Sequence, residues 1–317
     1  MKPTPKQLKH FFEVQAGKLN RCLEPAFECD KKTIRAHSIQ NARVLDLLVE
    51  EGHVITPKQK MSEDGPENSF EKVGRNNAST FTGLCAEHDT SLFQVLDKEP
   101  FDQDKPEQMF QLAYRSVTRE LYVVMEGAAR IQAAYQGKVE RGEIPSNVPT
   151  DHGLIATQFL MNAYETYQYR LAYFDTPLAS QEFGAVQHDV VRLRGQKPVL
   201  AVSSLFSLRG LLRSDDLVRC VLNVMPISDV ETVAVFSYAR DDGPMARAAL
   251  HRILSANGDY QKYELSKLNI DRVENFVLSP VSVASWKPEK TRIIRDAFVS
   301  TIFSEVEVAD HQDLMLF

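Results

Sequence analysis

The residues of this chain whose types and spacing suit chemistry lie in its first 90 positions. Cys85 and His88 form a Cys-x-x-His pair that is followed at once by Asp89, and Cys22 and Cys29 lie upstream. A structural zinc ion takes four cysteine or histidine ligands in a tetrahedron, and a short pair supplies two of them from one turn. We therefore predict a structural Zn²⁺ site made of Cys22, Cys29, Cys85 and His88, which stabilises a polar first domain.

The spacing leaves alternatives to this ligand set. Six residues separate Cys22 from Cys29, which is wider than the two to four residues typical of zinc pairs, and His37 is an alternative ligand to Cys22. In a reading without metal, Cys85 belongs to the hydrophobic core and His88 caps a helix. Four unevenly placed cysteines behind an N-terminus without a secretory pattern favour a reducing cytoplasm over a disulfide framework.

Two phrases of this region resemble the skeleton of HNH-type treble-clef proteins. They are Ala36-His37-Ser38-Ile39, followed by a helical pattern, and Leu84-Cys85-Ala86-Glu87-His88-Asp89 with Leu92-Phe93. The resemblance covers roughly residues 20–97. It implies a treble-clef fold in which an early cysteine pair and the later Cys-x-x-His pair hold the zinc ion.

The resemblance also implies a catalytic site. His37 corresponds to the general base that deprotonates water, Asp89 to a ligand of a catalytic Mg²⁺ or Mn²⁺ ion, and Asn76 or Asn77 to the middle asparagine of the family. Ala36 stands where active members commonly have Asp or His, and Asp89 stands where His is usual. The implied enzyme is a metal-dependent HNH-like nuclease, and a treble clef without nuclease activity is the alternative.

The charge of the chain does not indicate a general nucleic-acid binder. The net charge is −6, and residues 1–90 carry 13 Lys or Arg against 13 Asp or Glu, so there is no broad basic field. Lys31, Lys32 and Arg35 form the candidate local patch for nucleic acid. No apolar run approaches the ~20 residues that a membrane span needs.

Two functions follow from these observations. One is a zinc-binding protein that resembles HNH endonucleases and cleaves or binds nucleic acid, in a bacterial antiviral-defence or mobile-element setting. The other is a non-catalytic binding or sensor protein with purely structural zinc and a protein partner.

The periodicity of apolar residues predicts an α+β protein with two domains. These are a zinc-stabilised, treble-clef-like module over residues 1–100 and a helical plus α+β domain over residues 101–317, separated in the Pro-bounded stretch 97–106. Within the module we expect an amphipathic helix over 5–21, a strand over 31–37 and a helix over 41–51. A mobile surface loop over 57–79 follows, and another helix begins after the Cys-x-x-His pair.

The larger domain is predicted to begin with helices and to continue with an antiparallel sheet packed with helices. The first two helices are expected over about 106–142 and 151–190. Three antiparallel strands are expected over 198–206, 217–225 and 232–238, followed by helices over 244–256, 259–276 and 288–303.

Overall fold

The computed structural model describes residues 19–208, 211, 217–301 and 307–317. The strands in these residues are β1 (Thr33–His37), β2 (His53–Met61), β3 (Pro66–Gly74), β4 (Thr80–Cys85), β5 (Val186–Arg194), β6 (Leu200–Ser207), β7 (Arg219–Ser228), β8 (Glu231–Ala239) and β9 (Phe276–Leu278). The helices are α2 (Ala86–Leu92), α3 (Gln94–Lys98), α4 (Pro106–Glu140), α5 (Asp151–Arg170), α6 (Thr176–Ser180), α7 (Gly243–Ala249), α8 (His251–Leu254), α9 (Gly258–Arg272), α10 (Pro280–Ala284) and α11 (Pro288–Thr301).

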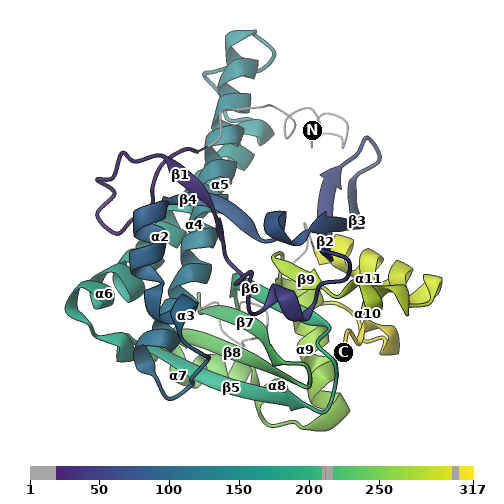
Figure 1. The fold of residues 1–317 in the computed structure, drawn as a ribbon. Helices are drawn as coiled ribbons and strands as arrows, with labels where there is room; N and C mark the ends of the chain where they lie inside the picture. The colour runs from purple at the N-terminus through teal and green to yellow at the C-terminus, as the bar shows by residue number, and fades with distance from the viewer. Residues whose placement is uncertain (1–18, 209–210, 212–216, 302–306) are drawn as a thin grey trace.

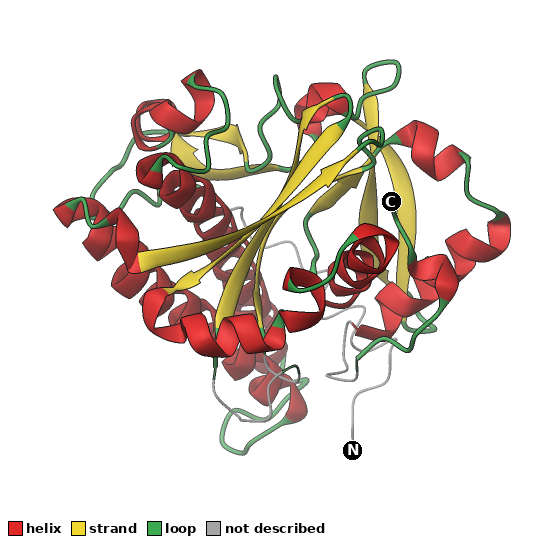
Figure 2. Ribbon diagram, turned by 90° about the horizontal axis from the view of Figure 1, so that it is seen from below, coloured by secondary structure: helices red, strands yellow, loops and turns green. Residues whose placement is uncertain are grey.

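The centre of the molecule is a seven-stranded antiparallel sheet in the order β3-β2-β9-β6-β7-β8-β5. Strands β1 and β4 form a separate antiparallel pair. Helices pack against the large sheet (Figures 1 and 2), so the predicted combination of helices with an antiparallel sheet is confirmed. The predicted strands over 31–37, 198–206, 217–225 and 232–238 correspond to β1, β6, β7 and β8.

The two faces of the large sheet bury different clusters of side chains. Leu222, Phe236 and Phe276 belong to the cluster that packs with α7, α8, α9 and α11. Their neighbours Val235 and Val277 point to the opposite face, where they pack with α4 and the N-terminal segment. Because successive side chains of a strand alternate between faces and both faces are covered, the central strands are apolar over most of their length.

Helix α4 connects the N-terminal segment to the sheet. Every residue from Gln108 to Thr118 is buried, so this part of the helix has no solvent-facing side. Several of its polar members are paired: Ser116 Oγ donates to Asn223 Oδ1 at 2.9 Å and accepts from Ser203 Oγ at 2.8 Å. Such pairing lowers the free-energy cost of burying polar side chains, since an unpaired buried polar group costs about 1–3 kcal/mol.

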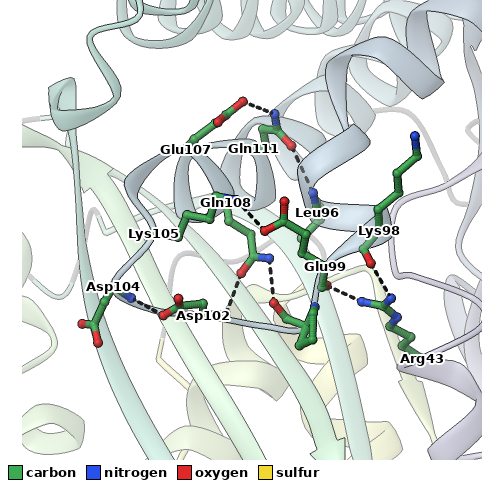
Figure 3. A network of polar contacts seen from close by, with 11 residues as sticks. Arg43, Leu96, Lys98, Glu99, Asp102, Asp104, Lys105, Glu107, Gln108 and Gln111 are labelled. Atoms are coloured by element: carbon green, nitrogen blue, oxygen red, sulfur yellow. Dashed lines mark hydrogen bonds and ion pairs between the residues drawn. The ribbon is translucent and has the colours of Figure 1, made fainter.

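The predicted linker over residues 97–106 is a hydrogen-bonded corner between α3 and α4 (Figure 3). The Gln108 side chain accepts from the Asp102 N–H at 2.6 Å and donates to the Pro100 carbonyl at 2.9 Å. Gln111 Oε1 accepts from the Leu96 N–H at 3.2 Å. The division of the chain at residue 100 stays a prediction, and the large sheet crosses it because β2 pairs with β9.

The prediction of a mobile loop over residues 57–79 is wrong, because most of this stretch forms the β2–β3 hairpin. Its outward-facing residues are polar, and Lys58 and Lys60 pair with Glu71 across the two strands at 2.8 and 3.4 Å. Its inward-facing Phe70 packs edge-to-face on Trp286. A strand with only one buried face needs few apolar residues, and this explains why its composition resembled that of a loop.

Three helix predictions are wrong over part of their length. Residues 41–51 form turns around a short 3₁₀ helix, Leu45–Leu47. The helix predicted to reach residue 190 ends with α6, after a π-helical turn at Leu171–Asp175, and Val186 begins β5. The helix predicted to reach residue 276 ends at Arg272, before β9. Short apolar runs do not distinguish helix from strand by periodicity, so tertiary pairing decided these segments. The helix predicted over 5–21 falls almost entirely outside the described residues.

Candidate metal centre

The four predicted zinc ligands meet at one end of the β1–β4 pair. Cys22 and Cys29 flank a loop, Cys85 is the last residue of β4, and His88 lies in the first turn of α2. Their ligand atoms all lie within 4.8 Å of one another. Within the described ranges no other group of three or more His, Cys, Asp or Glu side chains has this arrangement.

The distances between the ligand atoms fit a tetrahedral ion. With Zn–S bonds of about 2.3 Å and Zn–N bonds of about 2.0 Å, a tetrahedron separates two sulfurs by about 3.8 Å and a sulfur from a nitrogen by about 3.5 Å. Cys29 Sγ lies 3.9 Å from Cys85 Sγ. His88 Nδ1 lies 3.5 Å from Cys22 Sγ and 3.3 Å from Cys85 Sγ. The cysteines are free thiols, and 3.9 Å is far beyond the ~2.05 Å of a disulfide bond.

Burial makes this group of thiols dependent on a positive charge. Cys22 and Cys85 are buried, whereas Cys29 and His88 are partly exposed. Burial raises the pKa of the Cys22 thiol to about 11, so without a cation this sulfur stays protonated at neutral pH. Metal binding requires thiolates, and a divalent ion supplies the charge that stabilises them.

Backbone N–H groups orient the two buried sulfurs. The Cys85 N–H donates to Cys22 Sγ at 3.3 Å, and the His88 N–H donates to Cys85 Sγ at 3.5 Å, which makes Cys85 the N-cap of α2. Burial acts to raise the pKa of the Cys85 thiol, but hydrogen bonds from His88, Cys22 and Cys29 outweigh it and the pKa is lowered. Donors of this kind hold metal ligands in position.

Glu24 shapes the loop between the first two cysteines, although the sequence analysis did not identify it. Its Oε1 accepts from the Glu28 N–H at 2.6 Å and the Cys29 N–H at 3.1 Å, and its Oε2 accepts from the Ala26 N–H at 2.8 Å. Burial acts to raise the pKa of this carboxyl, but the three N–H donors lower it below its ordinary value. An acidic residue that follows a cysteine and precedes a turn is the signal that could have predicted this role.

The same loop is packed against α4 and α5. The Phe27 ring lies edge-to-face on Tyr167 at 5.5 Å, and the Arg170 guanidinium lies over it at 5.1 Å. Arg170 is fully buried and donates to Asp175 at 3.1 Å, and Asp175 also accepts from the Tyr114 hydroxyl at 2.6 Å. The candidate metal centre is therefore part of the central core.

His37 and Asp89, the two predicted catalytic residues, are both partly buried. His37 Nε2, Asp89 Oδ1 and Arg115 Nε are all buried and have no hydrogen-bond partner. Burial lowers the pKa of His37 and raises the pKa of Asp89, and the charge of Arg115 acts on both residues. The two other guanidinium nitrogens of Arg115 bind Asp97 at 2.8 and 2.6 Å. The catalytic role of His37 and Asp89 stays a prediction.

The candidate nucleic-acid patch consists of cations that are mostly paired within the protein. Lys31 forms an ion pair with Glu87, and Arg35 donates to Asn77 Oδ1 at 2.8 Å. The Asn77 side chain therefore accepts a hydrogen bond from Arg35 at the surface. Lys32 is exposed, and binding of nucleic acid at this patch stays a prediction.

Comparison with protein-family models, curated proteins and solved structures gave no match. None of the helices in the described part of the chain combines the length and the apolar character that a membrane span needs. The function must therefore be argued from the geometry of the candidate metal centre.

Proposed function

We propose that this chain is a zinc-binding protein in which Cys22, Cys29, Cys85 and His88 hold one structural Zn²⁺ ion. The observation that carries the proposal is the agreement of three ligand-to-ligand distances with the edges of a zinc tetrahedron. Thiolate and imidazole ligands favour zinc over Mg²⁺ or Ca²⁺, which prefer oxygen. Four protein ligands leave no position for water, so the ion stabilises the fold and does not activate a substrate.

The proposed ion joins segments that are distant in the chain, because it links the loop before β1 to the junction of β4 and α2. These are the loop that contains Cys22 and Cys29, the end of β4 and the start of α2. Besides the sulfur contacts, the loop pairs with β4 through the hydrogen bond from the Leu23 N–H to the Gly83 carbonyl, at 2.7 Å. Zinc binding therefore contributes directly to the folding free energy of the N-terminal segment.

Metal analysis of the purified chain tests this proposal. We expect one zinc ion per chain, and we expect Cys85→Ala to lose the ion and to unfold well below the wild-type temperature. Cys220→Ala is the matched control, since Cys220 is equally buried but lies in β7 outside the centre; it should retain zinc and lose only about 1 kcal/mol of stability. If the wild type contains no metal and the two variants are equally destabilised, the proposed zinc site is refuted.

HNH-like cleavage of nucleic acid is the second candidate function. The observation that favours it is the set of unpartnered polar atoms on His37, Asp89 and Arg115, because a catalytic role is one explanation for a buried polar atom without a partner. In this candidate function His37 deprotonates water and Asp89 binds Mg²⁺ or Mn²⁺. Because these atoms are buried, the side chains must open to admit a substrate.

A cleavage assay on plasmid DNA and RNA with Mg²⁺ or Mn²⁺ tests the second candidate. We expect cleavage by the wild type and its loss in His37→Ala, with zinc content and folding unchanged. Equal cleavage by wild type and variant would assign the activity to other residues, and an inactive wild type would exclude the candidate. In either case the structural zinc proposal is decided separately by the metal content.

A further inference from the structure

The outer face of α5 carries a concentration of exposed apolar side chains. Among the described residues ten large apolar side chains are exposed, and five of them lie within residues 148–164: Val148, Leu154, Leu160, Met161 and Tyr164. On a helix, residues three, four and seven positions apart share a face, so the four that belong to α5 form one stripe. The opposite face of α5, with Ala156, Ala163 and Thr166, is buried.

This stripe contains no formal charge. Residues 152–164 include no Asp, Glu, Lys or Arg, and the exposed polar positions among the apolar side chains are Thr157, Gln158 and Asn162. The charged residue that borders the stripe, Glu165, is ion-paired with Arg219. The exposed surface of a soluble domain is normally ~25–35% charged. Depletion of charge with enrichment of Tyr and Met is typical of the core of a protein–protein interface.

The helical hairpin that carries the stripe has little core of its own. Figure 1 shows the outer ends of α4 and α5 projecting beyond the rest of the molecule. The cluster that holds these ends together contains three buried residues, Ile131, Ala134 and Ala156, with three partly buried neighbours. A pair of helices with one thin apolar seam gains stability when a second pair covers its open face.

We propose that the exposed face of α5 binds the same face of a second copy of this chain, so that two hairpins form a four-helix bundle. Around a two-fold axis the same stripe of both copies meets, so that residue i contacts residue j and j contacts i, and a stripe of one charge would repel itself. The neutral Thr157 and Gln158 avoid this repulsion and can hydrogen-bond across the axis. In the antiparallel arrangement Leu154 of one copy lies near Tyr164 of the other, with Met161 close to the axis.

The size of the face sets the expected strength of this association. Five side chains that are each 48–59% exposed, together with their polar neighbours, present on the order of 500 Å². Pairing two copies removes roughly 1,000 Å² from water, which is the lower limit for a specific interface. The dimer is therefore weak, with a dissociation constant on the order of micromolar.

Sedimentation of the full chain from about 1 to about 100 µM tests this proposal over the range where such an interface associates. The wild type should pass from monomer to dimer with concentration. Met161→Glu should raise the dissociation constant at least tenfold, whereas Val281→Glu, at a 56% exposed position on α10, should leave it unchanged. Circular dichroism and zinc content should be the same in all these proteins.

Mixing complementary variants shows whether the two faces meet each other. Met161→Glu and Met161→Lys should each be monomeric, and their equimolar mixture should dimerise at least as well as the wild type. A wild type that stays monomeric throughout the range would overturn the proposal, as would a Met161→Glu dimer of unchanged affinity. Failure of the mixture to associate would equally overturn it, because the faces would then not pair with each other.

Discussion

Replacing Glu24 with glutamine tests whether the candidate metal centre depends on a preformed loop. The substitution keeps the size of the side chain but exchanges one carboxylate oxygen for an amide that cannot accept the N–H it faces. Oε1 has two donors and Oε2 has one, so the amide will place its oxygen toward Glu28 and Cys29 and leave the Ala26 N–H unpaired. The remaining two hydrogen bonds become neutral and weaker.

The structure sets the size of this effect. Glu24 is 7% exposed, so water replaces the lost acceptor poorly, and one hydrogen bond to a charged group contributes about 1.5–3 kcal/mol. If this free energy is lost from metal binding, the zinc affinity falls roughly 10- to 100-fold, which is the range typical of residues that orient ligands. Competition against a zinc chelator measures the affinity directly.

The matched control is Glu28→Gln, which removes the same charge from the same loop. The Glu28 side chain is exposed, so zinc affinity should change less than about twofold, as expected for a solvated charge near a surface site. Equal affinity losses in the two variants would refute the reasoning, because the effect would then arise from net charge near the ion. Unchanged affinity in Glu24→Gln would show that the loop needs no support from this carboxylate.

The remaining predictions concern the core beyond the metal centre. Burial lowers the pKa of His188 from 6.5 to about 4, so between these pH values the unfolded chain binds a proton that the folded chain does not, and stability falls by up to about 3 kcal/mol as the pH drops from 7 to 4. Urea titrations across this range should show a shallower decline in His188→Gln; an identical pH profile would contradict the assignment. Ser116→Ala should cost about 1–3 kcal/mol in the same assay by leaving Ser203 and Asn223 unpaired. A double variant with Asn223→Ala should lose less than the sum of the two single changes, and strict additivity would show that the residues act independently.

The sequence was informative wherever the determining interactions are local. The Cys-x-x-His pair needs only one turn at the end of a strand to bring Cys85 and His88 together. In the structure Cys85 Sγ lies 3.3 Å from His88 Nδ1. The strands β6, β7 and β8 were predictable because they are buried on both faces, which requires predominantly apolar, β-branched runs. The long helix α4 was predicted over about 106–142 from its apolar spacing, and it spans Pro106–Glu140.

Other elements depend on partners that are distant in the chain. The β2–β3 hairpin and β9 looked like a loop and a helix end, and they become strands because each supplies hydrogen bonds to the same sheet. The buried polar residues of α4, such as Ser116, are compatible with the core only because Ser203 and Asn223 lie opposite. Neither kind of pairing leaves a periodic signal in the local sequence.

The sequence by itself determined which residue types can bind a metal here, because thiol and imidazole chemistry belongs to the side chains. Only the tertiary structure decided that all four candidate ligands point to a common centre and that Glu24 shapes the loop between two of them. It also decided that His37 and Asp89 are partly buried and that the charge of Arg115 acts on both. The physical reason is that distances between side chains from separate segments are set by the way those segments pack around α4, and local sequence does not contain those distances.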